Sequence, residues 1–117
     1  MGCCPSMGAS MTNVSLSTAT GYQSVTESGP LPVRGTKATV GLLVTNVTGT
    51  ATITATLELS YDAGSTFKSG GSTTMTAAGP KEFSVSSIDA AVCRLKLEIS
   101  GTTVWCLMGA YLNWSTP

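Results

Sequence analysis

The chain has 117 residues, a formal net charge of zero and no histidine, with 10% charged and 42% hydrophobic residues. This length suits one domain, and the hydrophobic content excludes a disordered chain. The lack of a basic excess argues against a nucleic-acid partner. No apolar run reaches the roughly 18 residues of a membrane helix, so no membrane partner is expected either.

The first six residues read MGCCPS, a pattern that also occurs in N-terminal lipidation signals. A lipid anchor is the weaker interpretation, because myristoylation needs Met1 removed and the chain begins with it. We instead expect an extended N-terminal arm over residues 1–12, ahead of a sandwich domain over 13–117. The arm is predicted to contact a neighbouring subunit, with interface candidates Met1, Gly2, Cys3, Cys4 and Pro5.

The clearest strand pattern covers residues 50–61, TATITATLELSY, in which apolar and polar residues alternate. Such a period of two indicates one buried and one solvated face. The segment 36–47 is also strand-like, with apolar residues on both faces. Because TGT at 48–50 resembles a short turn, residues 36–61 are predicted to form a long hairpin. The predicted inward residues of the second strand are Ala51, Ile53, Ala55, Leu57, Leu59 and Tyr61.

The C-terminal part repeats this pattern in two segments, 92–99 and 103–114, separated by a Ser100-Gly101 turn typical of a hairpin. The inward faces are predicted to carry Cys93, Leu95, Leu97 and Ile99, then Val104, Cys106, Met108, Ala110 and Leu112. The other face of the last segment is apolar too, which predicts a cover on both sides. Its members are Trp105, Leu107, Gly109 and Tyr111.

Shorter strand candidates near residues 13, 22, 31, 72 and 81 complete the pattern, and no helix is expected. Strands at this spacing predict an all-β fold, a single antiparallel β-sandwich of jelly-roll or immunoglobulin-like type. Its core is predicted to bring together six residues from three segments: Leu57, Leu59, Leu95, Leu97, Cys106 and Met108.

Chemical motifs are sparse. Without histidine, Ser-His and Cys-His nucleophile pairs are excluded, and the acids lie at turns or on solvent faces. Asp62-Ala63-Gly64 is interpreted as a turn rather than a calcium loop. In the predicted hairpin Cys93 and Cys106 are diagonal neighbours at roughly 7–8 Å, which favours two buried free thiols over a disulfide. We therefore expect no enzyme activity, no catalytic residue, no metal and no cofactor.

Two stretches resemble small β-sandwich virion proteins of tailed bacteriophages. LELSYDAGSTF at 57–67 is similar to their strand that ends in Ser-x-Asp-Gly-Gly-x-x-Trp, with Ala63 and Phe67 as departures. AAVCRLKLEISG at 90–101 is similar to their penultimate strand. The resemblance implies a capsid decoration, minor capsid or tail protein, assembled into a virion in the host cytoplasm. Its partners would be copies of itself, major capsid proteins or tail proteins.

Two functions are consistent with these observations. The first is a non-enzymatic virion subunit, most simply on a capsid shell, because a surface with little charge is a surface suited to being covered. The alternative is a glycan-binding or adhesin-like module that uses exposed aromatic residues as sugar platforms. Interface candidates for the first are Trp105, Leu107, Tyr111 and Trp114, and the aromatic members of this set are also the platform candidates.

Overall fold

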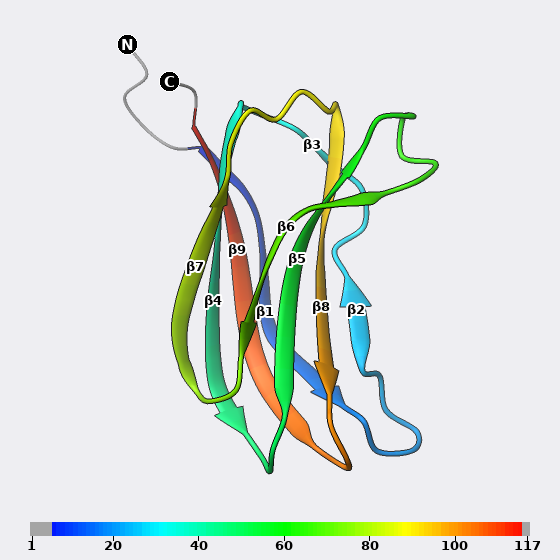
Figure 1. Ribbon diagram of the computed structural model, residues 1–117, viewed down its shortest axis with the longest axis vertical. Coiled ribbons are helices and arrows are strands. Elements are labelled where there is room, and N and C mark those ends of the chain that lie inside the picture. Colours follow the sequence, from blue (N-terminus) through cyan, green and yellow to red (C-terminus); the bar gives the residue numbers. More distant parts are fainter. Residues whose placement is uncertain (1–5, 116–117) are drawn as a thin grey trace.

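The computed structural model describes residues 6–115 as a sandwich of two antiparallel β-sheets (Figure 1). Within this range no helix has the length and apolarity that crossing a lipid bilayer requires. The described chain contains the strands β1 (Ser6–Ser17), β2 (Val25–Glu27), β3 (Leu31–Pro32), β4 (Lys37–Val47), β5 (Thr52–Ser60), β6 (Lys68–Met75), β7 (Gly79–Val85), β8 (Val92–Ser100) and β9 (Trp105–Ser115).

The strand order is that of a jelly roll. One sheet has the order β1-β9-β4-β7, and the other has the order β2-β8-β5-β6, with β3 also paired to β8. Among the described strands, β5 and β6 follow each other in the sequence and pair directly. In contrast, the connections that enter and leave β4, β7 and β8 each cross from one sheet to the other. This double crossing pattern distinguishes the fold from an immunoglobulin-like sandwich. The predicted all-β antiparallel sandwich is confirmed.

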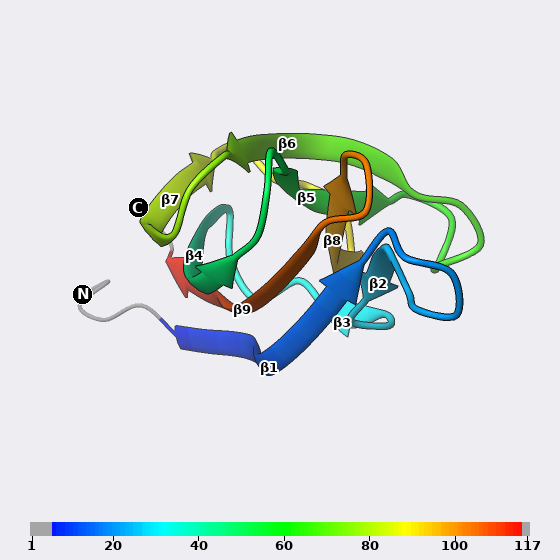
Figure 2. The same cartoon turned by 90° about the horizontal axis from the view of Figure 1, so that it is seen from below.

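Both predicted long hairpins are wrong. β4 pairs with β7 and β9 rather than with β5, and β8 pairs with β5 and β2 rather than with β9. The connections at 48–51 and 101–104 lead from one sheet to the other, as seen end-on in Figure 2. Gly49 and Gly101 support these sharp changes of direction with φ of 66° and 136°, values that side chains disfavour.

The predicted burial pattern of the long strands is confirmed. The inward side chains of β5 and β8 are at most 7% exposed, and those of β9 are at most 4% exposed. The six predicted core residues belong to one continuous hydrophobic cluster between the sheets. Alternation holds because successive side chains of a strand point to opposite faces. Those six residues are Leu57, Leu59, Leu95, Leu97, Cys106 and Met108.

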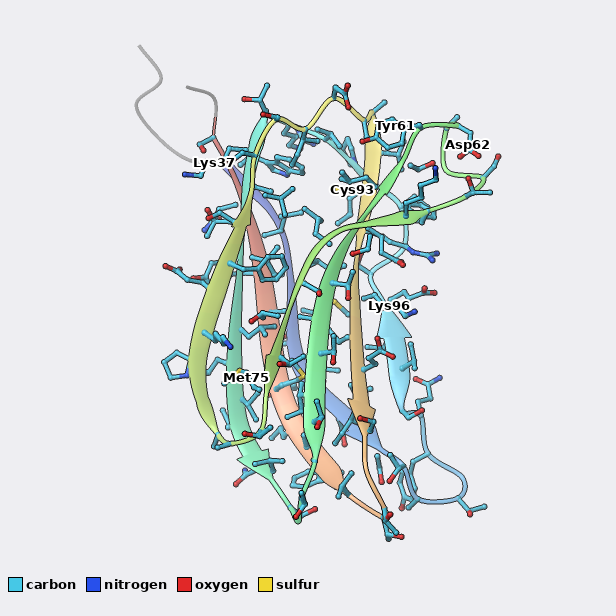
Figure 3. All side chains as sticks on the ribbon, in the orientation of Figure 1. Lys37, Tyr61, Asp62, Met75, Cys93 and Lys96 are labelled. Atoms are coloured by element: carbon cyan, nitrogen blue, oxygen red, sulfur yellow. The ribbon has the colours of Figure 1, made fainter. Side chains whose placement is uncertain are left out.

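The turn after β5 departs from the alternation. Tyr61 was expected to face inward, but it is 62% exposed because β5 ends at Ser60. Asp62 organises the turn as predicted, since its carboxylate accepts hydrogen bonds from the Thr66 hydroxyl and backbone N–H and from the Ser60 hydroxyl. These bonds, those from Thr66 first, lower the pKa of Asp62 to about 2. Figure 3 shows Tyr61 and Asp62 at one end of the sandwich.

Cys93 and Cys106 are buried free thiols, as predicted, but not for the predicted reason. They lie in different sheets, Cys93 opposite Leu31 and Leu59, and Cys106 opposite Leu16 and Val47. The diagonal arrangement within one hairpin is therefore wrong. Burial raises the pKa of Cys93 to about 11 and also raises the pKa of Cys106.

The expected boundary between arm and sandwich falls inside β1. From Ser6 onward this strand pairs with β9, beginning with Ser6 opposite Trp114. Residues 6–12 are thus extended, as expected, but they already belong to the four-stranded sheet. The rest of the predicted arm, residues 1–5, lies outside the described residues.

Leu97→Ala tests the core. Leu97 has no exposed surface, so the substitution should lower the free energy of unfolding by about 2–5 kcal/mol in a urea titration. Leu43→Ala is the matched control, because Leu43 is 52% exposed and its truncation should cost less than about 0.5 kcal/mol. Equal losses in the two variants would contradict the burial described above.

The buried thiols predict a loss of stability in alkali. Burial raises the pKa of Cys93 to about 11 in the folded chain, against 9.0 for an exposed thiol. The contribution of the protonated Cys93 thiol to the free energy of unfolding is therefore complete below pH 9, and it is lost as the pH rises toward 11. Urea unfolding at increasing pH measures it. The Cys93→Ala, Cys106→Ala double variant should be less stable at neutral pH but show a smaller alkaline decrease. An unchanged decrease would show that other groups cause it.

Candidate functional site

The outer faces of the two sheets differ in chemistry. On the five-stranded sheet, Arg94 forms ion pairs with Glu58 (Nε to Oε1, 2.6 Å) and Glu27 (Nη2 to Oε2, 3.0 Å). Its guanidinium carbon also lies 4.1 Å from the centre of the Phe67 ring. Lys96 projects outward from the same strand, β8 (Figure 3). Glu58 and Glu27 together satisfy the charge of Arg94, and this group of side chains stabilises the face rather than forming an open site.

The outer face of the four-stranded sheet carries the exposed ring of Tyr111. Tyr111 on β9 is opposite Gly41 on β4, which in turn is opposite Glu82 on the edge strand β7. A Cβ atom at Gly41 would overlap the Tyr111 ring, so the ring occupies the space above this glycine. The ring therefore extends across β4 toward the strand that carries Glu82, while the side chain remains 37% exposed.

A hollow of about 450 Å³ surrounds this ring. A second hollow of about 190 Å³ follows it along the sheet, and Leu43, itself 52% exposed, lines both. The Lys81 ammonium group, near the first hollow, donates to the Thr74 carbonyl oxygen at 2.9 Å. The residues that line the larger hollow are Leu42, Leu43, Pro80, Lys81, Glu82 and Tyr111.

Three of the predicted interface residues lie on this face. Trp105, Leu107 and Tyr111 are separated by even numbers of positions along β9, so their side chains face the same side, and they are only partly buried. The indole N–H of Trp105 donates to the Ser15 hydroxyl at 2.7 Å. The predicted cover on both sides of β9 is therefore not found within the described chain, where the outward residues contact solvent in part.

Trp114 was grouped with the surface aromatics, and the structure corrects this placement. It is 1% exposed and belongs to the hydrophobic cluster between the sheets. The reason is its phase, since Trp114 is two residues after the inward Leu112 and faces the same side. The remaining interface candidates, Met1, Gly2, Cys3, Cys4 and Pro5, lie outside the described residues.

Sequence reasoning missed Gly41, Leu43 and Glu82 as members of this site. Their contribution depends on the pairing of β4 with both β9 and β7, which the predicted 36–61 hairpin precluded. One signal was present: a glycine within a strand often marks a close approach of another group. The sequence alone gave no means to identify the group that approaches.

The described side chains around the hollow provide an open surface that a ligand can contact. Among residues 6–115 no three His, Cys, Asp or Glu side chains cluster in a way that would hold a metal ion. At the hollow, Glu82 is an exposed acid on an edge strand beside an aromatic ring and two apolar side chains. Such a surface can stack a ring, exclude water and accept hydrogen bonds.

Comparison with known proteins identifies a fold but no family. Neither a protein family nor a curated protein matches the sequence. Among solved structures, the carbohydrate-binding module CBM6cm-2 of Cellvibrio mixtus lichenase 5A, in complex with cellotriose, is 12% identical with a TM-score of 0.51, covering 92% of this chain and 97% of that one. A disulfide-linked pilus of Bacillus endospore appendages is 10% identical with a TM-score of 0.50, covering 100% and 95%.

A third similar structure is a protein of the T13 viral particle of IBDV. It is 10% identical with a TM-score of 0.54, and the match covers 96% of this chain but 30% of that chain. At these identities the three likenesses show the shared β-sandwich architecture alone. They comprise a carbohydrate-binding module, a pilus and a viral particle, and a tailed-phage protein is not among the three.

Proposed function

We propose that this chain is a non-catalytic carbohydrate-binding module whose site is the hollow around Tyr111. The observation that carries the proposal is the position of the Tyr111 ring above Gly41. A glycine at this point lets an aromatic ring rest on the backbone of β4 while part of it stays open to a ligand. The volume of the hollow, about 450 Å³, lies within the range of small-ligand sites.

The chemistry of the hollow matches the two surfaces of a sugar. One face of a pyranose ring exposes C–H groups, which pack on the electron-rich face of an aromatic ring. Its hydroxyl groups need hydrogen-bond acceptors at the rim, and the Glu82 carboxylate is positioned on the strand next to β4 to accept them. Leu43 and Pro80 complete the apolar part of the wall.

The similarity to the lichenase module supports this proposal at the level of architecture. That module was solved with cellotriose, and it aligns over nearly all of both chains. A jelly roll that binds a β-linked glucan is thus one known use of this fold. Cello-oligosaccharides are accordingly the first probes to test.

Calorimetric titration of these oligosaccharides, chosen after a glycan-array screen, tests the proposal. Tyr111→Ala should weaken binding about tenfold or more, equivalent to at least 1.4 kcal/mol, because it removes the stacking ring. Gly41→Ala should also weaken binding, because the added Cβ occupies the space of the ring and displaces it. Tyr22→Ala is the matched control, since Tyr22 is 72% exposed and does not line the hollow.

Three outcomes would overturn the proposal. The first is a wild-type chain that binds no glycan on the array. The second is a Tyr111→Ala variant that binds as well as Tyr22→Ala does. Binding by Gly41→Ala at wild-type strength would show that the position of the ring is irrelevant. In each variant, the free energy of unfolding should be measured first, so that a loss of fold is not counted as a loss of site.

A virion or other particle subunit is the second candidate function. The observation that favours it is the run of partly exposed apolar residues along β9 and β4, namely Trp105, Leu107 and Leu43, on a chain with 10% charged residues. Aromatic and apolar side chains of this kind form the centres of subunit contacts. The likenesses to a viral particle and to a disulfide-linked pilus support assembly at the level of architecture.

Particle association distinguishes the two functions. If this chain is an assembly subunit, the Trp105→Glu, Tyr111→Glu double variant should fold but remain outside the particle, because it places charge in the contact. A wild-type chain that stays monomeric and binds glycan would exclude this second function.

A further inference from the structure

β1 forms an open edge of the four-stranded sheet. It pairs with β9 and, within residues 6–115, with no other strand, and Figure 2 shows it at the margin of the sheet. Near its C-terminal end the Ser17 N–H donates to the Gln23 carbonyl oxygen at 2.8 Å, which closes that end of the edge. The earlier part of β1 leaves backbone N–H and C=O groups that another strand can pair with.

The other edge strands carry charged residues or proline, or are very short, which discourages such pairing. β1 carries no charged residue and no proline. β7 includes Pro80, Lys81 and Glu82. β6 begins with the charged residue Lys68, and β2 is only three residues long and ends with the charged residue Glu27. Charges, proline and shortness are the usual means of blocking an edge.

A bulge confines the usable part of this edge to the first half of β1. The pairing with β9 shifts register between Met11 and Val14, where Asn13 has a φ of 53°, so the strand bends there. Before the bulge, Ala9–Met11 runs in continuous register opposite Ala110–Leu112. A second register shift lies between Met7 and Ala9, so the regular part of the edge is Ala9–Met11, and Ser6–Met7 extends it beyond that shift.

We propose that Ser6–Met11 is the docking edge for a second copy of this chain, paired antiparallel about a two-fold axis. In such a pair the residue on the axis faces its own counterpart, and within a short segment any other charge lies close to the same charge of the second copy. A neutral strand avoids this repulsion, and the zero net charge of the chain adds none at long range. The pairing joins two four-stranded sheets into one continuous sheet. It does not depend on carbohydrate binding.

Sedimentation equilibrium of the full chain over a dilution series tests this proposal, with a reductant present so that no disulfide contributes. The wild type should form a dimer that dissociates on dilution. Ser10→Lys should weaken the dimer at least tenfold, because Ser10 is exposed within the docking segment and two lysines would meet near the axis. Thr39→Lys is the matched control: it adds the same charge at a partly exposed position of β4, away from the edge.

A second measurement locates the contact. Amide hydrogen exchange of Ser6–Met11 should be slow at high protein concentration and faster on dilution, whereas amides of β7 should not change. A monomer at all concentrations overturns the proposal. So does a dimer that Ser10→Lys leaves intact, a dimer that both lysine variants weaken equally, or concentration-dependent protection confined to β7 or to the face around Tyr111.

Discussion

Apolar side chains at alternate positions of β4, β5, β8 and β9 hold the two sheets together. Each of these strands contributes at least four buried inward residues to one continuous cluster. Burial at about 25 cal/mol per Å² of apolar surface makes this contact the main favourable term in folding. All other features of the molecule follow from it, because it fixes which face of each strand remains available on the outside.

The two outer faces then serve different purposes. Arg94 ties β8 to β2, β5 and the Phe67 loop by charge and stacking, which closes that face with its own side chains. Within residues 6–115 the face of the four-stranded sheet has no such cluster, and there Tyr111 lies over Gly41 beside an exposed acid and exposed apolar groups. A rigid sheet holds these groups in place, a favourable property for the binding site proposed here.

The sequence predicted the strands and their buried faces because alternation is a local property. Leu95 and Leu97 are assigned to the core by their neighbours alone, and the structure agrees. Pairing is not local: a short turn such as residues 48–50 can close a hairpin or cross between sheets, and alternation is the same in both cases. The candidate site could not be predicted for the same reason, because the contact of Tyr111 with Gly41 depends on the pairing of β4 with β9. Trp114 shows the opposite case, since its phase with Leu112 was readable and was overlooked.

The central claim is that ligand binds on the outer face of the four-stranded sheet around Tyr111. Amide chemical-shift mapping during titration with the oligosaccharide selected on the array tests it most directly. The account predicts that the shifted amides cluster at Gly41, Leu43, Glu82 and Tyr111, while those around Arg94 stay unchanged. Shifts centred on the five-stranded sheet, or no shifts at saturating oligosaccharide, would contradict it.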